Sequence, residues 1–445
     1  MNGVGGPWSA RRLHFIGVGG AGMSGYARAA HALGADVSGS DAARTPYVEA
    51  LERDGVLRAH VGHRAEQLPS GEGVEVIYSS AVPAENAERR AARERGFAER
   101  PRAELLAELT ALRRTIAVGG THGKTTTAAM LVHALRAAGL DPGWLVGGPV
   151  SGELPNARWG EGEWLVLEAD ESDRSMLSVR AEVAVLTNVE LDHHATFASL
   201  AQLRDAFREF LAPARWAVVW DRPELLALRE GPLVAYEPDA LQLTEGGSRF
   251  AWEGREVSLA VPGAHNARNA AGALAAAALA GADPDRAIAG LGAFGGAGRR
   301  FQLLGRGPGG SLVYDDYAHH PTEIAATLEG ARTLPHERLV AVFQPHLYSR
   351  TALLAREFGR ALALADAALV LDVYPACESP EQHPGVRGLM IAEAAADAAA
   401  GRPVYWMPEL ADAERALRGM LRAGDLCLVM GAGDVDALGR SLVAR

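Results

Sequence analysis

A glycine-rich stretch with a single lysine, residues 119–126, holds the residue types best suited to phosphate chemistry. Lys124 is the only lysine among the 445 residues. The apolar run before the stretch predicts a buried strand, and we expect a helix over residues 125–138. Backbone N–H groups and a helix N-terminus can then surround a phosphate, while the ammonium reaches its outer oxygens and Thr125 can bind Mg²⁺. Val118 stands where the strict phosphate-loop pattern has glycine, so we predict a variant loop.

Two clusters of polar residues are expected beside this loop. A predicted strand over residues 164–167 is followed by EADESD, and a second over 183–186 is followed by TNVELDHH. Parallel strands present their carboxyl ends at one edge of a sheet, where ligands bind. Four acids within six residues repel one another unless a cation or hydrogen-bond donors compensate. Oxygen ligands with an imidazole favour Mg²⁺ or Mn²⁺ over zinc; a solvated acidic loop is the alternative.

A second glycine pattern lies near the N-terminus. Gly17, Gly19 and Gly22 fit G-x-G-x-x-G after a predicted strand over residues 13–16. The next predicted strand ends at Asp41, where a ribose-binding carboxylate stands in dinucleotide folds. Alone, the pattern favours NAD, and a turn needed only for helix–strand packing is the alternative. We therefore expect a ligand with a phosphate or a ribose at this turn.

The last third of the chain adds further polar groups. Asn266 and Asn269 begin an alanine-rich helix, where their amides either cap the helix or pair with a purine edge. The segment DDYAHHPT follows a predicted strand and precedes a helix whose N-cap we place near Thr322. Its acids and histidines are either turn residues or ligand-binding groups. Other predicted elements are strands over 74–79, 339–343, 368–373 and 426–430, and helices over 85–95 and 104–114.

Length and composition limit the class of protein. The chain is long enough for about three domains, and we place boundaries near residue 108 and in the glycine-rich connector 290–298. A net charge of −11 argues against a general binder of nucleic acid or of a membrane surface. The two cysteines form no disulfide framework, and we find neither a signal peptide nor a membrane span. We therefore expect a cytoplasmic protein.

Eight motifs, in this order, resemble those of the Mur ligases of peptidoglycan synthesis: GVGGAGM, GTHGKTTT, EADESD, NVELDHH, HNARN, GRRF, DDYAHHPTE and FQPHLYSR. The resemblance runs from about Leu13 to the C-terminus. It implies three α/β domains: an N-terminal Rossmann-like UDP-binding domain over 1–108, a central P-loop-type ATPase domain over 109–298, and a C-terminal doubly wound, dinucleotide-binding-like domain over 299–445.

The resemblance also implies an activity. ATP would activate the lactyl carboxylate of UDP-N-acetylmuramate as an acyl phosphate, which the amine of L-alanine would attack through a tetrahedral intermediate. The glycine loop and the DDYAHHPTE block favour the member that adds L-alanine over the later ligases. Mg²⁺ or Mn²⁺ would assist, and no nucleic acid or membrane would take part.

The site residues that the resemblance implies fall into four groups. The UDP-sugar would contact Gly19, Gly20, Ala21, Gly22, Met23, Asp41 and Ser80. ATP would contact Gly120, Thr121, His122, Gly123, Lys124, Thr125, Thr126, Asn266 and Asn269, with Arg300 and Asp316 closing over it. The metal would be bound by Thr125, Glu168 and His193, and the amino acid by Tyr317, His346 and Arg350. Catalysis would rest on Lys124, Glu168, His193, Arg300 and Asp316.

The sequence departs from the family pattern at two points. Leu347 follows the histidine of FQPH, where the family often has a basic residue, so the alanine carboxylate depends more on Arg350. Several sibling ligases carry a carbamylated lysine near the metals, and no lysine besides Lys124 exists here. His193 or His346 could accept the proton of the amine, although a metal on His193 would prevent it from doing so.

Three other functions compete with this one. A related ligase attaches a recycled tripeptide to the same UDP-sugar and would differ only in the amine pocket. An NAD-dependent oxidoreductase would explain Gly17 to Asp41 but not the lysine loop. A nucleotide-gated binding module would hold the same ligands without chemistry. We expect Lys124→Ala to abolish activity and to leave the fold intact, because a lysine in a loop has little packing to lose.

Overall fold

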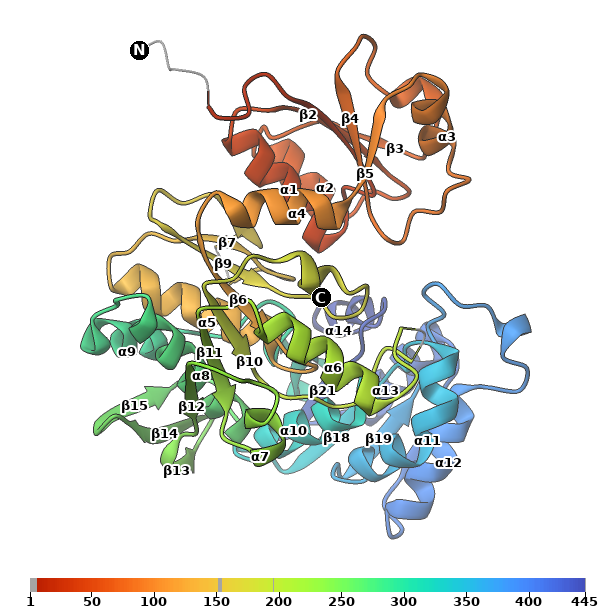
Figure 1. The fold of residues 1–445 in the computed structure, drawn as a ribbon. Helices are drawn as coiled ribbons and strands as arrows, with labels where there is room; N and C mark the ends of the chain where they lie inside the picture. The colour runs from red at the N-terminus through yellow and green to blue at the C-terminus, as the bar shows by residue number, and fades with distance from the viewer. Residues whose placement is uncertain (1–5, 151–153, 195, 445) are drawn as a thin grey trace. The chain divides into compact units, whose positions relative to one another are not determined.

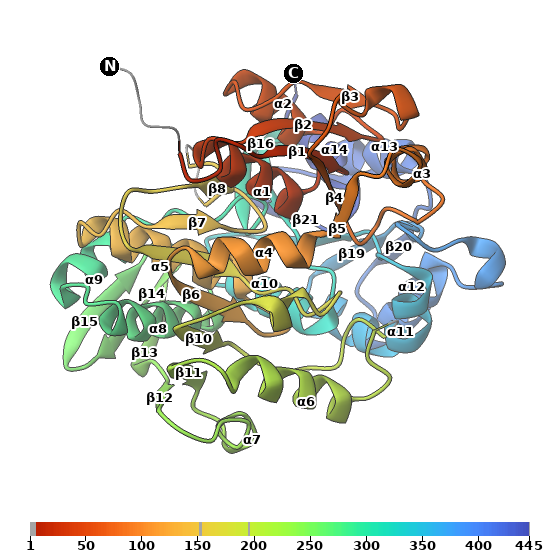
Figure 2. The same cartoon turned by 45° about the horizontal axis from the view of Figure 1, so that its top comes forward.

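The computed structural model describes residues 6–150, 154–194 and 196–444. The chain divides into two compact units, one of residues up to 237 together with 269–290, and one of residues 238–268 together with 291–445. Every large sheet alternates strands with helices, which confirms the predicted α/β class (Figures 1 and 2). Among the described residues, no helix is both long and apolar enough to cross a membrane.

The first sheet of the first unit is a five-stranded parallel sheet of order β3-β2-β1-β4-β5. Its strands are β1 (Arg12–Ile16), β2 (Asp36–Asp41), β3 (Ala59–Val61), β4 (Val74–Tyr78) and β5 (Ala98–Pro101). Its helices are α1 (Ala21–Ala32), α2 (Pro46–Arg53), α3 (Ala87–Glu94) and α4 (Arg102–Ala111). Helices α1, α2 and α4 pack on one face and α3 on the other (Figure 1). The order reverses between β1 and β4, the place where open sheets of this kind bind ligands.

The second sheet of this unit has seven strands in the order β12-β11-β10-β6-β9-β7-β8, parallel except for the β7–β8 pair. Its strands are β6 (Arg114–Gly119), β7 (Gly143–Leu145), β8 (Ala157–Arg158), β9 (Trp164–Glu168), β10 (Val183–Leu186), β11 (Trp216–Trp220) and β12 (Leu233–Tyr236). Its helices are α5 (Lys124–Ala137), α6 (Leu200–Leu211), α7 (Pro223–Leu226) and α9 (Pro284–Gly292). The three strands predicted to end in polar clusters, β6, β9 and β10, are adjacent and parallel.

The second unit contains a three-stranded antiparallel sheet and a six-stranded sheet of order β16-β17-β21-β18-β19-β20, in which β16 alone is antiparallel to its neighbour. The small sheet consists of β13 (Asp239–Thr244), β14 (Gly247–Trp252) and β15 (Arg255–Leu259). The large one consists of β16 (Gln302–Arg306), β17 (Leu312–Asp316), β18 (Arg338–Phe343), β19 (Ala367–Val370), β20 (Val404–Trp406) and β21 (Asp425–Met430). Its helices are α10 (Pro321–Ala331), α11 (Tyr348–Leu362), α12 (Gly388–Ala398), α13 (Leu410–Met420) and α14 (Asp436–Val443), with α11 and α12 side by side (Figure 2). Helix α8 (Ala264–Leu279) contributes residues to both units.

Several element boundaries differ from those predicted. The helix placed at 104–114 ends at Ala111, because Arg114 already begins β6. The strand placed at 368–373 ends at Val370, and the connector placed at 290–298 begins only after α9, at residue 293. The N-cap of α10 is His320 rather than Thr322: its Nδ1 accepts from the Thr322 N–H at 3.4 Å, and Pro321 supplies the helical φ of the first turn.

Candidate functional site

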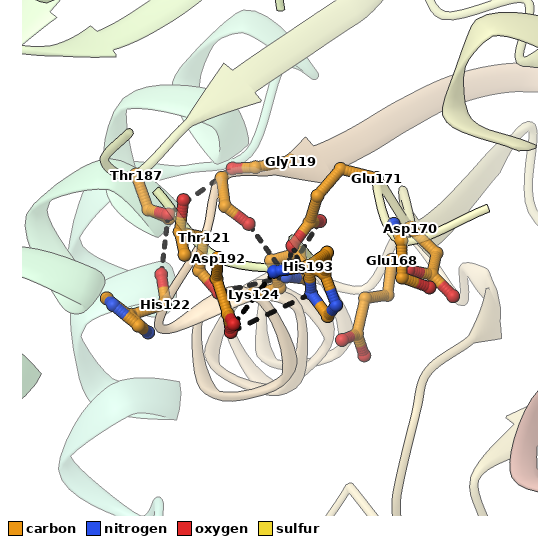
Figure 3. A network of polar contacts seen from close by, with 12 residues as sticks. Gly119, Thr121, His122, Lys124, Glu168, Asp170, Glu171, Thr187, Asp192 and His193 are labelled. Atoms are coloured by element: carbon orange, nitrogen blue, oxygen red, sulfur yellow. Dashed lines mark hydrogen bonds and ion pairs between the residues drawn. The ribbon is translucent and has the colours of Figure 1, made fainter. Parts of the chain in front are cut away.

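The lysine loop joins β6 to α5 through two glycines in the left-handed region, with φ of 130° at Gly120 and 80° at Gly123. Residues that follow β10 hold this loop. The Thr187 hydroxyl donates to the His122 carbonyl at 2.6 Å (Figure 3). Asn188 accepts from the His122 N–H at 2.8 Å and donates to its carbonyl at 2.9 Å. The loop is therefore shaped before any ligand binds.

Lys124 contacts two backbone carbonyls of this loop and one carboxylate outside it. Its Nζ donates to the carbonyl of Gly120 at 2.7 Å and to that of Thr121 at 3.0 Å, and it lies 2.9 Å from both carboxylate oxygens of Glu171 (Figure 3). The Glu171 side chain is fully buried. Burial by itself would lower the pKa of Lys124, but the surrounding carboxylates, Glu171 foremost, raise it above its usual value. The lysine is therefore a permanent cation at the start of α5.

Thr125 and Glu168 lie together at the carboxyl ends of β6 and β9. The Thr125 hydroxyl is 3.0 Å from each carboxylate oxygen of Glu168, which also accepts from the Gly147 N–H at 2.7 Å. The His193 Nε2 lies 3.2 Å from the Glu171 carboxylate. Its φ of 54° is unusual for histidine and marks a constrained position. Of the three predicted metal ligands, the structure thus pairs Thr125 with Glu168, and His193 with Glu171.

The donors at this edge fit a magnesium ion. Hydroxyl and carboxylate oxygens are the ligands that Mg²⁺ prefers, and such sites contribute only one or two carboxylates beside the substrate phosphates. Because His193 Nε2 faces Glu171, the ring nitrogen left for another ligand is Nδ1. Thr125 and Glu168 are therefore the best-placed ligands, and His193 is held at their edge of the sheet.

The two asparagines predicted near adenine fall in different units. Asn269, in the first unit, lies against the lysine loop: a Cβ added to Gly123 would come within 2.6 Å of its Oδ1. Asn266, in the second unit, donates to the Pro262 carbonyl at 2.7 Å, so its amide takes part in the local structure of the helix start. Both side chains are buried.

The glycine turn after β1 is closed by two residues, one at the end of β2 and one shortly after it. The Gly19 N–H donates to Asp41 Oδ2 at 2.8 Å, and the Thr45 hydroxyl donates to the Gly19 carbonyl at 2.9 Å. Helix α1 begins directly after Gly20 and has neither an acid nor a side-chain cap in its first turn. Its first N–H groups and its dipole are therefore available to an anion. Of the other predicted contacts, Met23 is buried in the hydrophobic core, and Ser80 is exposed just beyond β4.

A cavity of about 180 Å³ lies between α1, the start of α4 and the carboxyl ends of β7 and β9. Its lining includes Ala21 and Gly22 in the first turn of α1 and Glu168, one of the candidate metal ligands. Its lining residues are Ala21, Gly22, Gly25, Tyr26, Arg102, Leu106, Leu145, Val146, Gly147, Leu167, Glu168 and Asp170.

Asp316 and Arg300 lie in the second unit, at the end of β17. The Asp316 carboxylate is buried and accepts from the N–H of Phe301 and from that of Ala318, each at 2.7 Å. Burial raises the pKa of Asp316 to about 6, although Arg300 and these amides favour its charged form. The guanidinium of Arg300 lies 5.1 Å from the ring centre of Tyr317. Asp316 thus orders the segment that carries Arg300.

The three residues predicted to contact the amino acid belong to the same unit. Tyr317 and His346 each contact the ring of His319, with centroids 5.4 and 6.0 Å apart respectively. Arg350 is buried, and its Nη1 lies 3.4 Å from His346 Nδ1. Leu347 has a φ of 71°, uncommon for leucine, and directly precedes α11. The structure therefore brings Tyr317, His346 and Arg350 into one cluster, with Leu347 at its border.

Several residues that shape the site were not assigned from the sequence. Glu171 was seen only as one of four acids, although it contacts both Lys124 and His193. Thr187 and Asn188 hold the loop, and Arg102 lines the cavity. Thr187 and Asn188 directly follow β10. This position was a usable signal, because polar residues at the ends of adjacent parallel strands meet. For Arg102 the sequence carried no comparable signal.

Comparison with protein families gives three matches in chain order. "Mur ligase family, catalytic domain" matches residues 12–114, "Mur ligase middle domain" matches 118–277, and "Mur ligase, glutamate ligase domain" matches 299–433. Together they span most of the chain.

Similar proteins agree with these matches. The UDP-N-acetylmuramate–L-alanine ligase of Rubrobacter xylanophilus is 43% identical over 98% of this chain and 100% of its own length. The crystal structure of UDP-N-acetylmuramate–alanine ligase from Thermotoga maritima aligns with a TM-score of 0.82 at 28% identity, over 97% of this chain and 98% of that one. A murein peptide ligase from Psychrobacter arcticus aligns with a TM-score of 0.73 at 25% identity, with the same coverage of both chains.

Proposed function

The chain belongs to the Mur ligase family, and from this premise we propose that it joins L-alanine to the lactyl carboxylate of UDP-N-acetylmuramate at the expense of ATP. The protein is an ATP-dependent ligase of peptidoglycan precursor synthesis, with ATP as co-substrate. The three-domain organisation expected from the sequence is confirmed by the three family matches. The limits 1–108, 109–298 and 299–445 stay predictions, as does location in the cytoplasm.

One observation carries this proposal: a cavity is lined both by the first turn of α1, at Ala21 and Gly22, and by Glu168, the carboxylate that lies beside Thr125. A UDP-sugar bound by its diphosphate at the start of α1 would extend its sugar acid along the cavity toward Glu168 and Thr125. The γ-phosphate of ATP, held at Lys124, would then meet the carboxylate at the carboxyl ends of β6 and β9. An oxidoreductase that bound NAD at Gly17 to Asp41 would not explain the lysine loop or the metal-ligand candidates beside it.

The residues fit the first chemical step, attack of a carboxylate on a phosphoryl group. Two anions must approach, so catalysis depends on fixed positive groups. Lys124 and the loop amides would stabilise the charge that spreads over the γ-phosphate, and Arg300 would add a second cation from the third domain. Mg²⁺, when bound by Thr125 and Glu168, would neutralise phosphate charge and orient the attacking oxygen.

The second step joins the amine to the acyl phosphate and expels phosphate. Arg350 would bind the carboxylate of L-alanine, with Tyr317 and His346 beside it; Leu347 offers no charge to assist. With Nε2 3.2 Å from the buried Glu171 carboxylate, His193 would have no ring nitrogen left for the amine proton once a metal bound Nδ1. This arrangement makes His346 the better acceptor for the proton of the amine. Exclusion of water would protect the acyl phosphate from hydrolysis.

The alternative substrate is a murein tripeptide in place of L-alanine. The likeness to the L-alanine ligase of T. maritima, with a TM-score of 0.82, exceeds that to the murein peptide ligase, with 0.73. This difference favours L-alanine as the amine.

The test is phosphate release from ATP with Mg²⁺, UDP-N-acetylmuramate and one amine at a time. L-alanine should support the fastest release, ahead of glycine, L-serine and the tripeptide, and no release should occur when either the UDP-sugar or the amine is left out. Faster turnover with the tripeptide would establish the alternative. Absence of release with every amine would refute the ligase assignment.

A further inference from the structure

We propose that Arg102 binds the diphosphate of the nucleotide-sugar through its Nη1 group and so connects that ligand to the acidic loop after β9. The inference rests on the proposed function, because it names a further binding residue for the same UDP-sugar. Arg102 is the first residue of α4 and lines the cavity described above.

The guanidinium of Arg102 uses only part of its hydrogen-bonding capacity. Nε donates to Asp173 at 2.7 Å, and Nη2 donates to Asp170 at 2.9 Å and to the Ser175 hydroxyl at 3.3 Å. These bonds fix the plane of the guanidinium, and its side chain is only 14% exposed. The Nη1 group lies in the same plane, on the side of the guanidinium nearest Gly22 of α1. An arginine held in this way reaches a phosphate oxygen with little loss of side-chain entropy.

Gly22 shows where Nη1 points. A Cβ added at Gly22 would lie 3.1 Å from Arg102 Nη1, so this glycine of the G-x-G-x-x-G pattern leaves room for the guanidinium. Gly22 is in the first turn of α1, which has no acid and no side-chain cap. Nη1 and the first N–H groups of α1 are therefore neighbours that face one cavity. Both are donors for an anion, and neither alone would define a site.

The charge of Arg102 is unfavourable for α4 itself. A cation at the first residue of a helix opposes the helix dipole, so arginine does not stabilise α4 there. Asp170 and Asp173 offset that cost. The incoming diphosphate would be separated from these aspartates by the width of the guanidinium, with the α1 amides on its other side.

The arrangement has a consequence for catalysis. Asp170 and Asp173 lie in the same loop as Glu168 and Glu171, which contact Thr125 and Lys124. An arginine that contacts both the diphosphate and this loop would hold the sugar acid in register with the γ-phosphate. Arg102 is thus a binding and positioning residue between the two substrates.

The test is calorimetric titration of the full-length protein with UDP-N-acetylmuramate, with uridine and with ATP–Mg²⁺. Arg102→Gln should weaken binding of UDP-N-acetylmuramate about 10- to 100-fold, the usual effect of losing a hydrogen bond to a charged group. Binding of uridine and of ATP–Mg²⁺ should not change. If Arg102 had a purely structural role, the substitution would weaken the binding of all three ligands together or of none.

Arg100→Gln is the matched control. Arg100 precedes the same helix and bonds Glu75, Glu104 and Glu108, but it does not line the cavity, so this variant should bind all three ligands like the wild type. Arg102→Lys keeps a positive charge beside Asp170, so it serves as the test if Arg102→Gln fails to fold. The affinity of this variant for UDP-N-acetylmuramate should fall at least about threefold.

The outcomes separate the two hypotheses. Wild-type affinity for UDP-N-acetylmuramate in a folded Arg102→Gln or Arg102→Lys protein would overturn the inference and leave the proposed function in place. Failure of the wild-type protein to bind UDP-N-acetylmuramate would overturn the proposed function, and the inference with it.

Discussion

Two glycine turns in the first unit share one plan and differ in where their charge comes from. Each lies between a central parallel strand and the helix that follows, β1 and α1 in one case and β6 and α5 in the other. The turn after β6 carries its own cation, Lys124, paired with the buried Glu171. Residues 17–24 after β1 contain no charged side chain, and their charged neighbours are Asp41 and Arg102 on other elements.

This difference matches the two tasks of a ligase site. A turn that only binds a diphosphate can rely on N–H groups and on donors supplied from elsewhere. A turn at which phosphate is transferred must stabilise charge that moves during the reaction, and a cation fixed inside the turn does so without reorganisation. The glycine pattern alone therefore indicates phosphate binding, whereas the buried lysine indicates phosphoryl transfer.

The largest expected effect is that of Lys124→Ala, which should lower turnover by a factor of about 10²–10³ or more. The structure revises our expectation that the fold is unaffected. Removal of Lys124 leaves the buried Glu171 carboxylate without its permanent cation and with the His193 ring at 3.2 Å, which should destabilise the protein by up to about 3–5 kcal/mol. Turnover by phosphate release and stability by thermal unfolding measure the two effects.

The double variant Lys124→Ala/Glu171→Gln should regain much of the stability and none of the activity. Arg136→Ala, at the far end of α5, serves as the control for a lost cation in the same helix. If the single variant turned over at nearly the wild-type rate, the assignment of this turn to phosphoryl transfer would be wrong.

Next in size is Glu168→Ala, which should raise the Mg²⁺ concentration needed for half-maximal activity about 10- to 100-fold. Glu168 is bonded to Thr125, and its loss removes the carboxylate expected to bind the ion. Glu163→Ala, an exposed glutamate just before the same strand, should leave the metal titration unchanged. An unchanged Mg²⁺ titration for Glu168→Ala would show that this residue is not a metal ligand. It would also weaken the assignment of phosphoryl transfer to the turn after β6.

The smallest effect is expected for Asp41→Asn in the first turn. The Asp41 carboxylate accepts the Gly19 N–H, and its replacement should weaken UDP-N-acetylmuramate binding about 3- to 10-fold while leaving ATP binding alone. Asp36→Asn, at the exposed start of the same strand, should behave like the wild type. Calorimetry with both ligands measures the effect; a loss of ATP affinity in Asp41→Asn, or any binding of NADH by the wild type, would contradict the division of tasks.

Local patterns predicted most of what the sheets contain. The runs of β10 and of residues 339–343 in β18 are apolar because strands of a parallel sheet are buried on both faces, and both strands were placed to within a residue or two. The polar clusters after β6, β9 and β10 were correctly expected at one edge. Helix ends were less predictable, as at α4, because their limits depend on neighbouring elements rather than on periodicity.

The sequence by itself determined the α/β class, the two glycine turns and the single lysine, since turn chemistry and hydrophobic periodicity are local properties. Only the tertiary structure decided which acid pairs with Lys124 and which arginine faces Gly22. Glu171 and Arg102 are 47 and 80 residues away from those partners along the chain. Charged side chains so far apart are matched by the order of strands in a sheet, and no local pattern encodes that order.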